Sequence, residues 1–202
     1  MSVQKHHYES WLAQYGNPAS MLAMLKEHRP YMEKIPSLRR LDESLIIIPF
    51  PLVRLREGIS QKGLNGIEVN SGETLCLSSE FGIVMCDPDW KIKAGIEIFV
   101  FVHRPNEDFS DLFLRWRQTQ VLLDKGYEWV MPYHHRHMYS EGADRIFPLF
   151  ILFEQTPERL KRGLTGANLP FVVQTEEMIL EENAEPTAIE EMECERSDAI
   201  ED

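Results

Sequence analysis

The run GIEIFVFVH, from Gly95 to His103, constrains the fold of this chain more than any other stretch. In an extended strand its side chains alternate between two faces. The first face carries Ile96, Ile98, Val100 and Val102. The second face carries Glu97, Phe99, Phe101 and His103. Because both faces are mostly apolar, we expect a central strand of a sheet that is covered on both sides.

Helix signals occur on both sides of this strand. Asn17-Pro18 offers an N-cap residue followed by proline at the first helical position, which predicts an N-terminal helical pair at about Lys5 to Tyr15 and Pro18 to Lys34. After the strand, apolar residues recur at helical spacing between Asn106, a candidate cap, and Gly126. We expect one long helix from about Asn106 to Lys125 across the sheet, and a short helix in TPERLKRG, residues 156–163.

Short apolar runs separated by turn residues predict the other strands. SLIIIPFPLVRLRE, residues 44–57, is rich in β-branched residues and is broken by Pro49 and Pro51, which fits a strand with a proline-bent edge. The runs between Ile67 and His103 indicate an antiparallel meander, and residues 127–139 and 145–154 look extended. The predicted fold class is α+β, with a mainly antiparallel sheet of five to seven strands.

The net charge of −12 is not spread over the chain. Residues 1–174 carry 20 Lys and Arg against 21 Asp and Glu, a balance of −1, whereas residues 175–202 carry 1 basic residue against 12 acidic ones, a balance of −11. A neutral body argues against a basic groove for phosphates and against a folded acidic mimic of nucleic acid. The acidic segment has no aromatic residue and cannot bury enough surface to fold alone. We predict a single α+β domain over residues 1–174 and an acidic, disordered tail over residues 175–202.

Targeting signals and common catalytic motifs are not found in the sequence. The N-terminus lacks a signal peptide, and the longest apolar run, Leu45 to Val53, is too short for a membrane span, so we expect a cytoplasmic protein. Cys76, Cys86 and Cys194 are odd in number and have no CxxC spacing, which predicts reduced thiols and no disulfide framework. No GxGxxG, Walker A, GxSxG or HExxH pattern occurs.

The segment VMPYHHRHMY, residues 130–139, is the one stretch whose residue types suggest a metal site. In a strand His135 and His137 share a face, and Glu141 follows four residues later. Two imidazoles and a carboxylate could bind one divalent ion such as Zn, Fe or Ni. Over these seven residues the His-x-His-x3-Glu pattern resembles the first metal motif of the cupin barrels. The resemblance implies a metal-dependent enzyme with His135, His137 and Glu141 as ligands.

The same segment also departs from a cupin. The flanking glycines of that motif are missing, since Gly126 is too distant and Pro148 occupies the closing region. No histidine follows His137, so a third imidazole would have to be His103. We therefore do not infer the family, and we favour the alternative that the histidines and Arg136 hydrogen-bond at a solvated strand end or at a partner surface.

The favoured functional hypothesis is a non-enzymatic interaction protein: an assembly, adaptor or inhibitory accessory factor. It would bind another protein through the folded body, and its acidic tail would contact a basic surface of that partner or keep the complex soluble. Such features would suit an accessory protein of a phage or mobile element, although this is an association without a physical basis. Neither direct nucleic-acid binding nor membrane binding is expected, an oligomer is compatible with the sequence, and the competing class is the metal-dependent enzyme.

Overall fold

The computed structural model describes residues 5–32, 45–56, 59–60, 68–86, 93–130, 141–143 and 145–175. The predicted acidic tail beyond Thr175 and the predicted ligands His135 and His137 lie outside these residues. The helices are α1 (Lys5–Tyr15), α2 (Pro18–Glu27), α3 (Arg29–Met32), α4 (Phe109–Leu123) and α5 (Glu158–Gly166). The strands are β1 (Leu45–Pro49), β2 (Leu52–Leu55), β3 (Ile59–Ser60), β4 (Glu68–Val69), β5 (Thr74–Cys76), β6 (Phe81–Cys86), β7 (Lys93–Val102), β8 (Tyr127–Trp129), β9 (Arg145–Phe153) and β10 (Phe171–Gln174). This is an α+β fold, as predicted.

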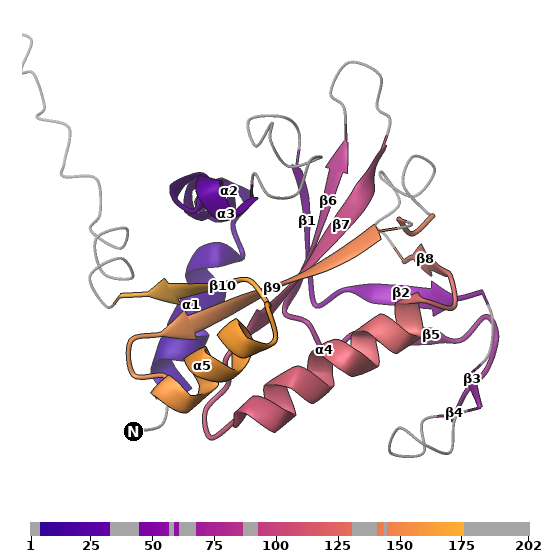
Figure 1. Ribbon diagram of the computed structural model, residues 1–202. Helices are drawn as coiled ribbons and strands as arrows, with labels where there is room; N and C mark the ends of the chain where they lie inside the picture. The colour runs from indigo at the N-terminus through magenta and orange to yellow at the C-terminus, as the bar shows by residue number, and fades with distance from the viewer. Residues whose placement is uncertain are drawn as a thin grey trace, which may run out of the picture.

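A five-stranded sheet with the order β1-β6-β7-β9-β10 forms the centre of the molecule (Figure 1). Helices cover both of its faces. On one face α1 and α2 pack through Trp11 and Met24 against Ile98 and Val100 of β7. On the other face α4 and α5 pack through Trp116 and Leu160 against Phe99 and Phe101. The prediction that the run from Ile96 to Val102 is a central strand, buried on both faces, is confirmed.

The direction of the strands differs from the prediction in the second half of this sheet. Strand β6 is antiparallel to both of its neighbours, β1 and β7, but β9 runs parallel to β7, and β10 runs parallel to β9. Helix α4 lies between β7 and β9 in the chain, and α5 lies between β9 and β10. A helical crossover brings the chain back to the same end of the sheet, so the next strand is parallel. The sheet is therefore mixed, and α5 shares with α4 the face that the long helix was expected to cover.

The helix boundaries agree with the sequence signals in part, and the short helix predicted in residues 156–163 is α5, which begins at Glu158 and extends to Gly166. Helix α1 has the predicted bounds, whereas the second predicted helix stops at Glu27, and the short helix α3 follows it. Helix α4 is capped by Asp108 and not by Asn106: its carboxylate accepts from the backbone N–H of Asp111, and Asp111 accepts in return from the backbone N–H of Asp108. This reciprocal pair is a capping box, which stabilises the first turn.

The proline-containing run from Leu45 to Leu55 forms two strands in two sheets and not one bent strand. Strand β1 is an edge of the main sheet, and β2 is the middle strand of a three-stranded sheet with the order β5-β2-β8. The change of sheet occurs at Phe50, whose φ is 44°. Val53 and Leu55 of β2 point into the same hydrophobic cluster as Phe99, so the small sheet packs against the α4 side of the main sheet. No described helix is long and apolar enough to cross a membrane.

The small sheet packs closely against Gly82 of β6. A Cβ atom at this position would lie 2.5 Å from Cη2 of Trp129 in β8, and the indole is itself buried and stacked on Phe99. Overpacking of this kind costs about 1–3 kcal/mol. We expect Gly82→Ala to lower the free energy of unfolding, measured by urea denaturation, by that amount.

Gly95 of β7 provides a matched control, because a Cβ atom there would meet nothing within 4 Å. Gly95→Ala should leave the stability unchanged or raise it by up to about 1 kcal/mol, since alanine restricts the unfolded chain. Equal losses for the two variants would contradict the packing of β8 on β6.

Candidate functional site

The predicted metal ligands can be compared with the structure only in part. Glu141 is exposed, with 80% of its side chain accessible, and its Oε1 lies 3.2 Å from Nη2 of Arg56. Within the described ranges, no three His, Cys, Asp or Glu side chains group together as metal ligands would. His135 and His137 are outside those ranges, so the metal-dependent enzyme stays a prediction.

His103, the suggested third imidazole, is buried and has partners at both ring nitrogens. Its Nδ1 lies 3.0 Å from Oγ1 of Thr156, and its Nε2 lies 2.9 Å from the carbonyl oxygen of Glu107. Burial lowers the pKa of His103 below its usual value of 6.5, so the folded protein favours the neutral ring. Its contribution to stability is therefore complete above pH 6.5 and is lost as the pH falls below 6.5, where the unfolded chain takes up the proton first. We conclude that His103 holds the turn before α4.

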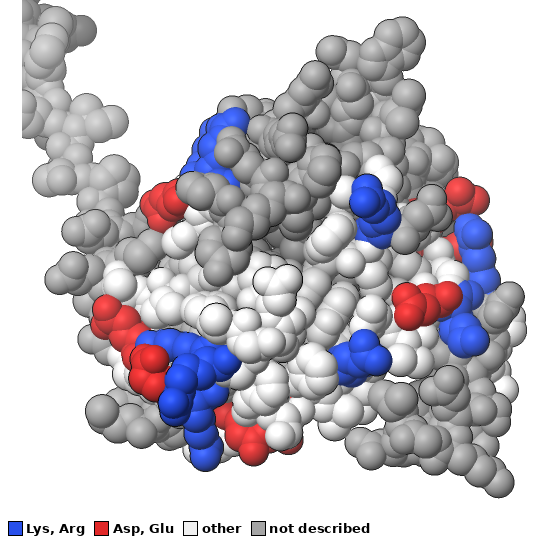
Figure 2. Space-filling model, viewed as in Figure 1, with Lys and Arg blue, Asp and Glu red and all other residues white. Residues whose placement is uncertain are grey.

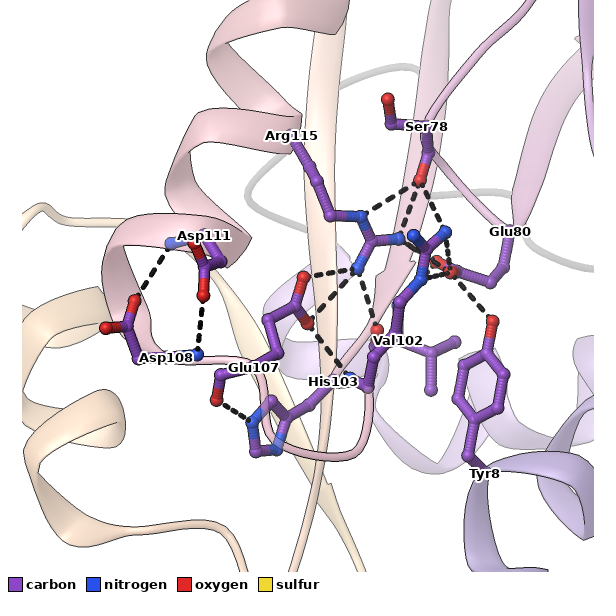
Figure 3. Close-up of polar contacts among 10 residues, drawn as sticks. Tyr8, Ser78, Glu80, Val102, His103, Glu107, Asp108, Asp111 and Arg115 are labelled. Carbon is purple, nitrogen blue, oxygen red and sulfur yellow. Dashed lines mark hydrogen bonds and ion pairs between the residues drawn. The ribbon is translucent and has the colours of Figure 1, made fainter. Parts of the chain in front are cut away.

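A buried network of charges lies beside His103 (Figure 3). The carboxylate of Glu80, which is not accessible to solvent, receives hydrogen bonds from Nη2 of Arg115 at 2.6 Å and from Nη2 of Arg104 at 2.8 Å. It also accepts from the hydroxyl of Tyr8 in α1 and from the backbone N–H of Val102. Burial is the main reason that the pKa of Tyr8 is raised. Because these donors occupy both carboxylate oxygens, the network joins the sheet to α1 and α4.

Arg115 is the member of this network that contacts most of the others. It donates to Glu80, to both carboxylate oxygens of Glu107 and to the carbonyl oxygens of Ser78 and Val102. Breaking a buried ion pair by removing one partner costs about 3–5 kcal/mol, because the other charge stays buried. We expect Arg115→Met to lower the free energy of unfolding by this amount in urea titrations at neutral pH.

Arg117 on the same helix is the control for that change. Its guanidinium is exposed and donates to Oε1 of Gln120 at 2.7 Å, so Arg117→Met should change the stability by less than about 0.5 kcal/mol. If the two variants lost the same stability, Arg115 could not be the centre of a buried network.

The outer face of the three-stranded sheet is the first candidate binding surface. Along β2 and the two residues before it, exposed and buried side chains alternate: Phe50, Leu52 and Arg54 are exposed, and Pro51 and Val53 are buried. Phe50 is 53% exposed and Leu52 is 40% exposed, and they are the large hydrophobic residues that the described part of the chain leaves exposed. Arg54 next to them has no ion-pair partner among the described residues. We call Phe50, Leu52 and Arg54 the β2 row.

The backbone of Phe50 is unusual for an aromatic residue. Its φ of 44° lies in the left-handed region, where a bulky side chain is strained. The other described non-glycine residues with positive φ are Asn106 and Asn168, and asparagine tolerates this conformation well. Such strain costs on the order of 1–3 kcal/mol and is typical of functional positions.

The second candidate is a cavity of about 270 Å³ at the end of α4. Arg56 and Asp124 are its charged lining residues, and Leu123, Tyr127, Ala143 and Ile146 contribute the ring and aliphatic groups. Behind the cavity wall the Tyr127 hydroxyl donates to the buried carboxylate of Glu97, and burial raises the pKa of that phenol. A Cβ on Gly142 would lie 2.5 Å from the Tyr127 ring, so only glycine lets the chain close against it.

The charged side chains on the face shown in Figure 2 are interspersed, with lysine and arginine next to aspartate and glutamate. This pattern agrees with the near-neutral charge balance of residues 1–174. A phosphate-binding groove would need a continuous positive surface. On the described part of that face, the charges favour short-range pairing over a broad electrostatic attraction.

The sequence predictions did not include either candidate surface. The alternation in FPLVRLR was visible, but the run was interpreted as one strand edge. The acid at position 124 sits two residues before the helix-ending glycine, where a basic residue is expected. Comparisons with protein-family models, with curated proteins and with solved structures found no match for this chain.

Proposed function

We propose that the protein is a non-enzymatic interaction factor that binds a partner protein through the β2 row. The observation that supports this best is Phe50, an aromatic side chain held in solvent on a strained backbone. Nothing in the two hydrophobic clusters requires it, since the Phe50 ring belongs to neither. Strain without a packing benefit is expected where the side chain serves a binding partner.

The composition of the β2 row supports the same proposal. Aromatic residues and arginine are enriched among the residues that dominate binding energy at protein interfaces. Leu52 extends the apolar contact, and Arg54 has no competing ion pair within the described structure. A partner with an apolar depression would gain most of its affinity from Phe50 and Leu52.

The acidic residues 175–202 add an electrostatic contribution to this proposal. Their balance of −11 would attract a basic surface on the partner, whereas the neutral body would provide the specific contact. The described chain reaches this segment at Thr175, directly after β10 at the edge of the main sheet. Assembly, adaptor and inhibitory roles are all compatible with such an arrangement.

The proposal is tested by replacing Phe50 with asparagine, which tolerates a positive φ. Phe50→Asn should leave the melting temperature unchanged or slightly raised, because it removes strain, but it should weaken partner binding at least about tenfold, as expected for an aromatic hot spot. The partner is first identified by affinity capture from the native host and mass spectrometry. The dissociation constant is then measured with the purified partner.

Asn168→Gly is the matched control, because Asn168 is another exposed residue with positive φ and lies after α5. It should bind the partner as tightly as the unchanged protein. Unaltered binding by Phe50→Asn, or equal weakening by Asn168→Gly, would rule out the β2 row as the binding surface.

The role of the acidic segment is tested by a chain truncated after Gln174. We expect its melting temperature to stay nearly unchanged. At low salt, it should bind the partner more weakly than the full chain does. The difference from the full chain should shrink as the ionic strength rises, since salt screens exposed charges over a distance of about 8 Å at 0.15 M. A truncated chain that unfolds would show that the segment belongs to the folded domain.

A further inference from the structure

We infer that the cavity at the end of α4 receives a lysine or arginine side chain of the partner protein. The claim that this side chain comes from the partner rests on the proposed function. The claim that the cavity binds an organic cation does not depend on it. Three features support this inference: the charges around the cavity, the position of Asp124 and the continuity with β2.

The charges around the cavity favour a cation. Its one positive lining residue, Arg56, lies 3.2 Å from Glu141 and 3.7 Å from Glu128, so two carboxylates already neutralise the guanidinium. Asp124 has no such partner among the described residues and is exposed to the cavity. Glu128, Glu141 and the adjacent Lys125 do not line the cavity, so Asp124 is the lining charge that has no counterion among the described residues.

The position of Asp124 strengthens this attraction. Asp124 is the C-cap residue of α4, at the end where the helix dipole is negative. A carboxylate there is unfavourable for the helix, and α4 has no basic residue in its last turn to compensate. A bound ammonium or guanidinium group would interact favourably with both the carboxylate and the helix end. Asp124 therefore destabilises the C-terminal end of α4 in the absence of a ligand, and a bound cation would remove this unfavourable interaction.

The size and the apolar lining select a side chain over a larger ligand. A cavity of about 270 Å³ is slightly below the range of about 300–1,000 Å³ that is typical of small-molecule pockets. Leu123 and Ile146 can cover the methylene groups of a lysine or arginine, whose stems bury readily against apolar surface.

The cavity is continuous with the proposed binding surface. Arg56 directly follows β2, two residues after Arg54, and its backbone N–H donates to the carbonyl oxygen of Gly126 beside the cavity. A partner that contacts Phe50 and Leu52 could therefore insert a basic side chain beyond Arg56. The acidic segment 175–202 would also attract a basic partner of this kind.

The test uses the full ¹⁵N-labelled chain without any partner. n-Butylammonium and n-propylguanidinium, which mimic the two side chains, are titrated at constant ionic strength, and the amide shifts of Gly126, Tyr127, Gly142 and Ala143 are followed. We expect saturable shifts with both cations and none with 1-butanol or butyrate. Shifts with butyrate, or shifts that 1-butanol reproduces, would overturn the inference.

Two variants with opposite expectations keep the test decisive. Asp124→Asn should weaken cation binding about tenfold, the change that a loss of 1.4 kcal/mol produces, and Arg56→Gln should tighten it by removing the positive charge from the cavity lining. Glu158→Gln removes an equally negative, exposed charge on α5 and should leave binding unchanged. Equal effects of Asp124→Asn and Glu158→Gln, or weaker binding by Arg56→Gln, would contradict the inference.

The results separate this inference from the proposed function. If the cations bind as expected but Phe50→Asn still binds the partner normally, the proposed function fails and the cavity remains a cation site. If Phe50→Asn loses the partner but no cation binds, only the inference fails.

Discussion

The burial of β7 on both faces is the constraint on which the rest of the fold depends. Every side chain from Ile96 to Val102 is buried, and full burial of one large apolar side chain contributes about 1.5–3 kcal/mol. Six such side chains yield a gross contribution comparable to the net stability of a whole domain, about 5–15 kcal/mol. The chain can realise this contribution only if helices cover both faces, as α1 with α2 and α4 with α5 do. The position of α4 in turn places Arg115, in the middle of the helix, in the charge network and Asp124, at its C-terminal end, in the cavity lining.

Two buried carboxylates determine how the neighbouring elements dock on this central strand. Glu97 of β7 accepts hydrogen bonds from the Tyr127 hydroxyl and from Nε1 of Trp129, the latter at 2.7 Å, so β8 has one favourable position over the main sheet. Glu80, before β6, does the same for α4 through Arg115 and for α1 through Tyr8. A buried charge without partners is costly, so each carboxylate selects the arrangement that supplies its donors. Apolar packing alone would be less specific about these docking positions.

Local patterns were sufficient to predict β7, α1 and α4, because alternation and helical spacing are properties of neighbouring residues. The parallel direction of β9 and β10 was not predictable in this way, since RIFPLFILF has the same composition in either direction and the crossover helix decides. The pairing of Glu80 with Arg115 joins residues 35 apart, and no local pattern indicates it. For the candidate sites, residue type alone is not sufficient. The predicted ligands His135 and His137 lie outside the described residues, whereas Phe50 and Asp124 become informative only when their backbone and helix positions are known.

Phe50 and Asp124 each depart from a local preference, Phe50 in its backbone conformation and Asp124 in its charge at a helix C-terminus. The other described positive-φ positions outside glycine are held by asparagine, and the acids Asp108 and Asp111 lie at the N-terminal end of α4, where the dipole favours them. A sequence selected for stability alone would remove both exceptions with single substitutions. The two are far apart in sequence, yet β2 connects them, because the strand starts beside Phe50 and is followed by Arg56, which lines the cavity together with Asp124. Local rules are most often broken where function requires it. The convergence of two independent exceptions on one surface is therefore a stronger argument for binding than either residue alone.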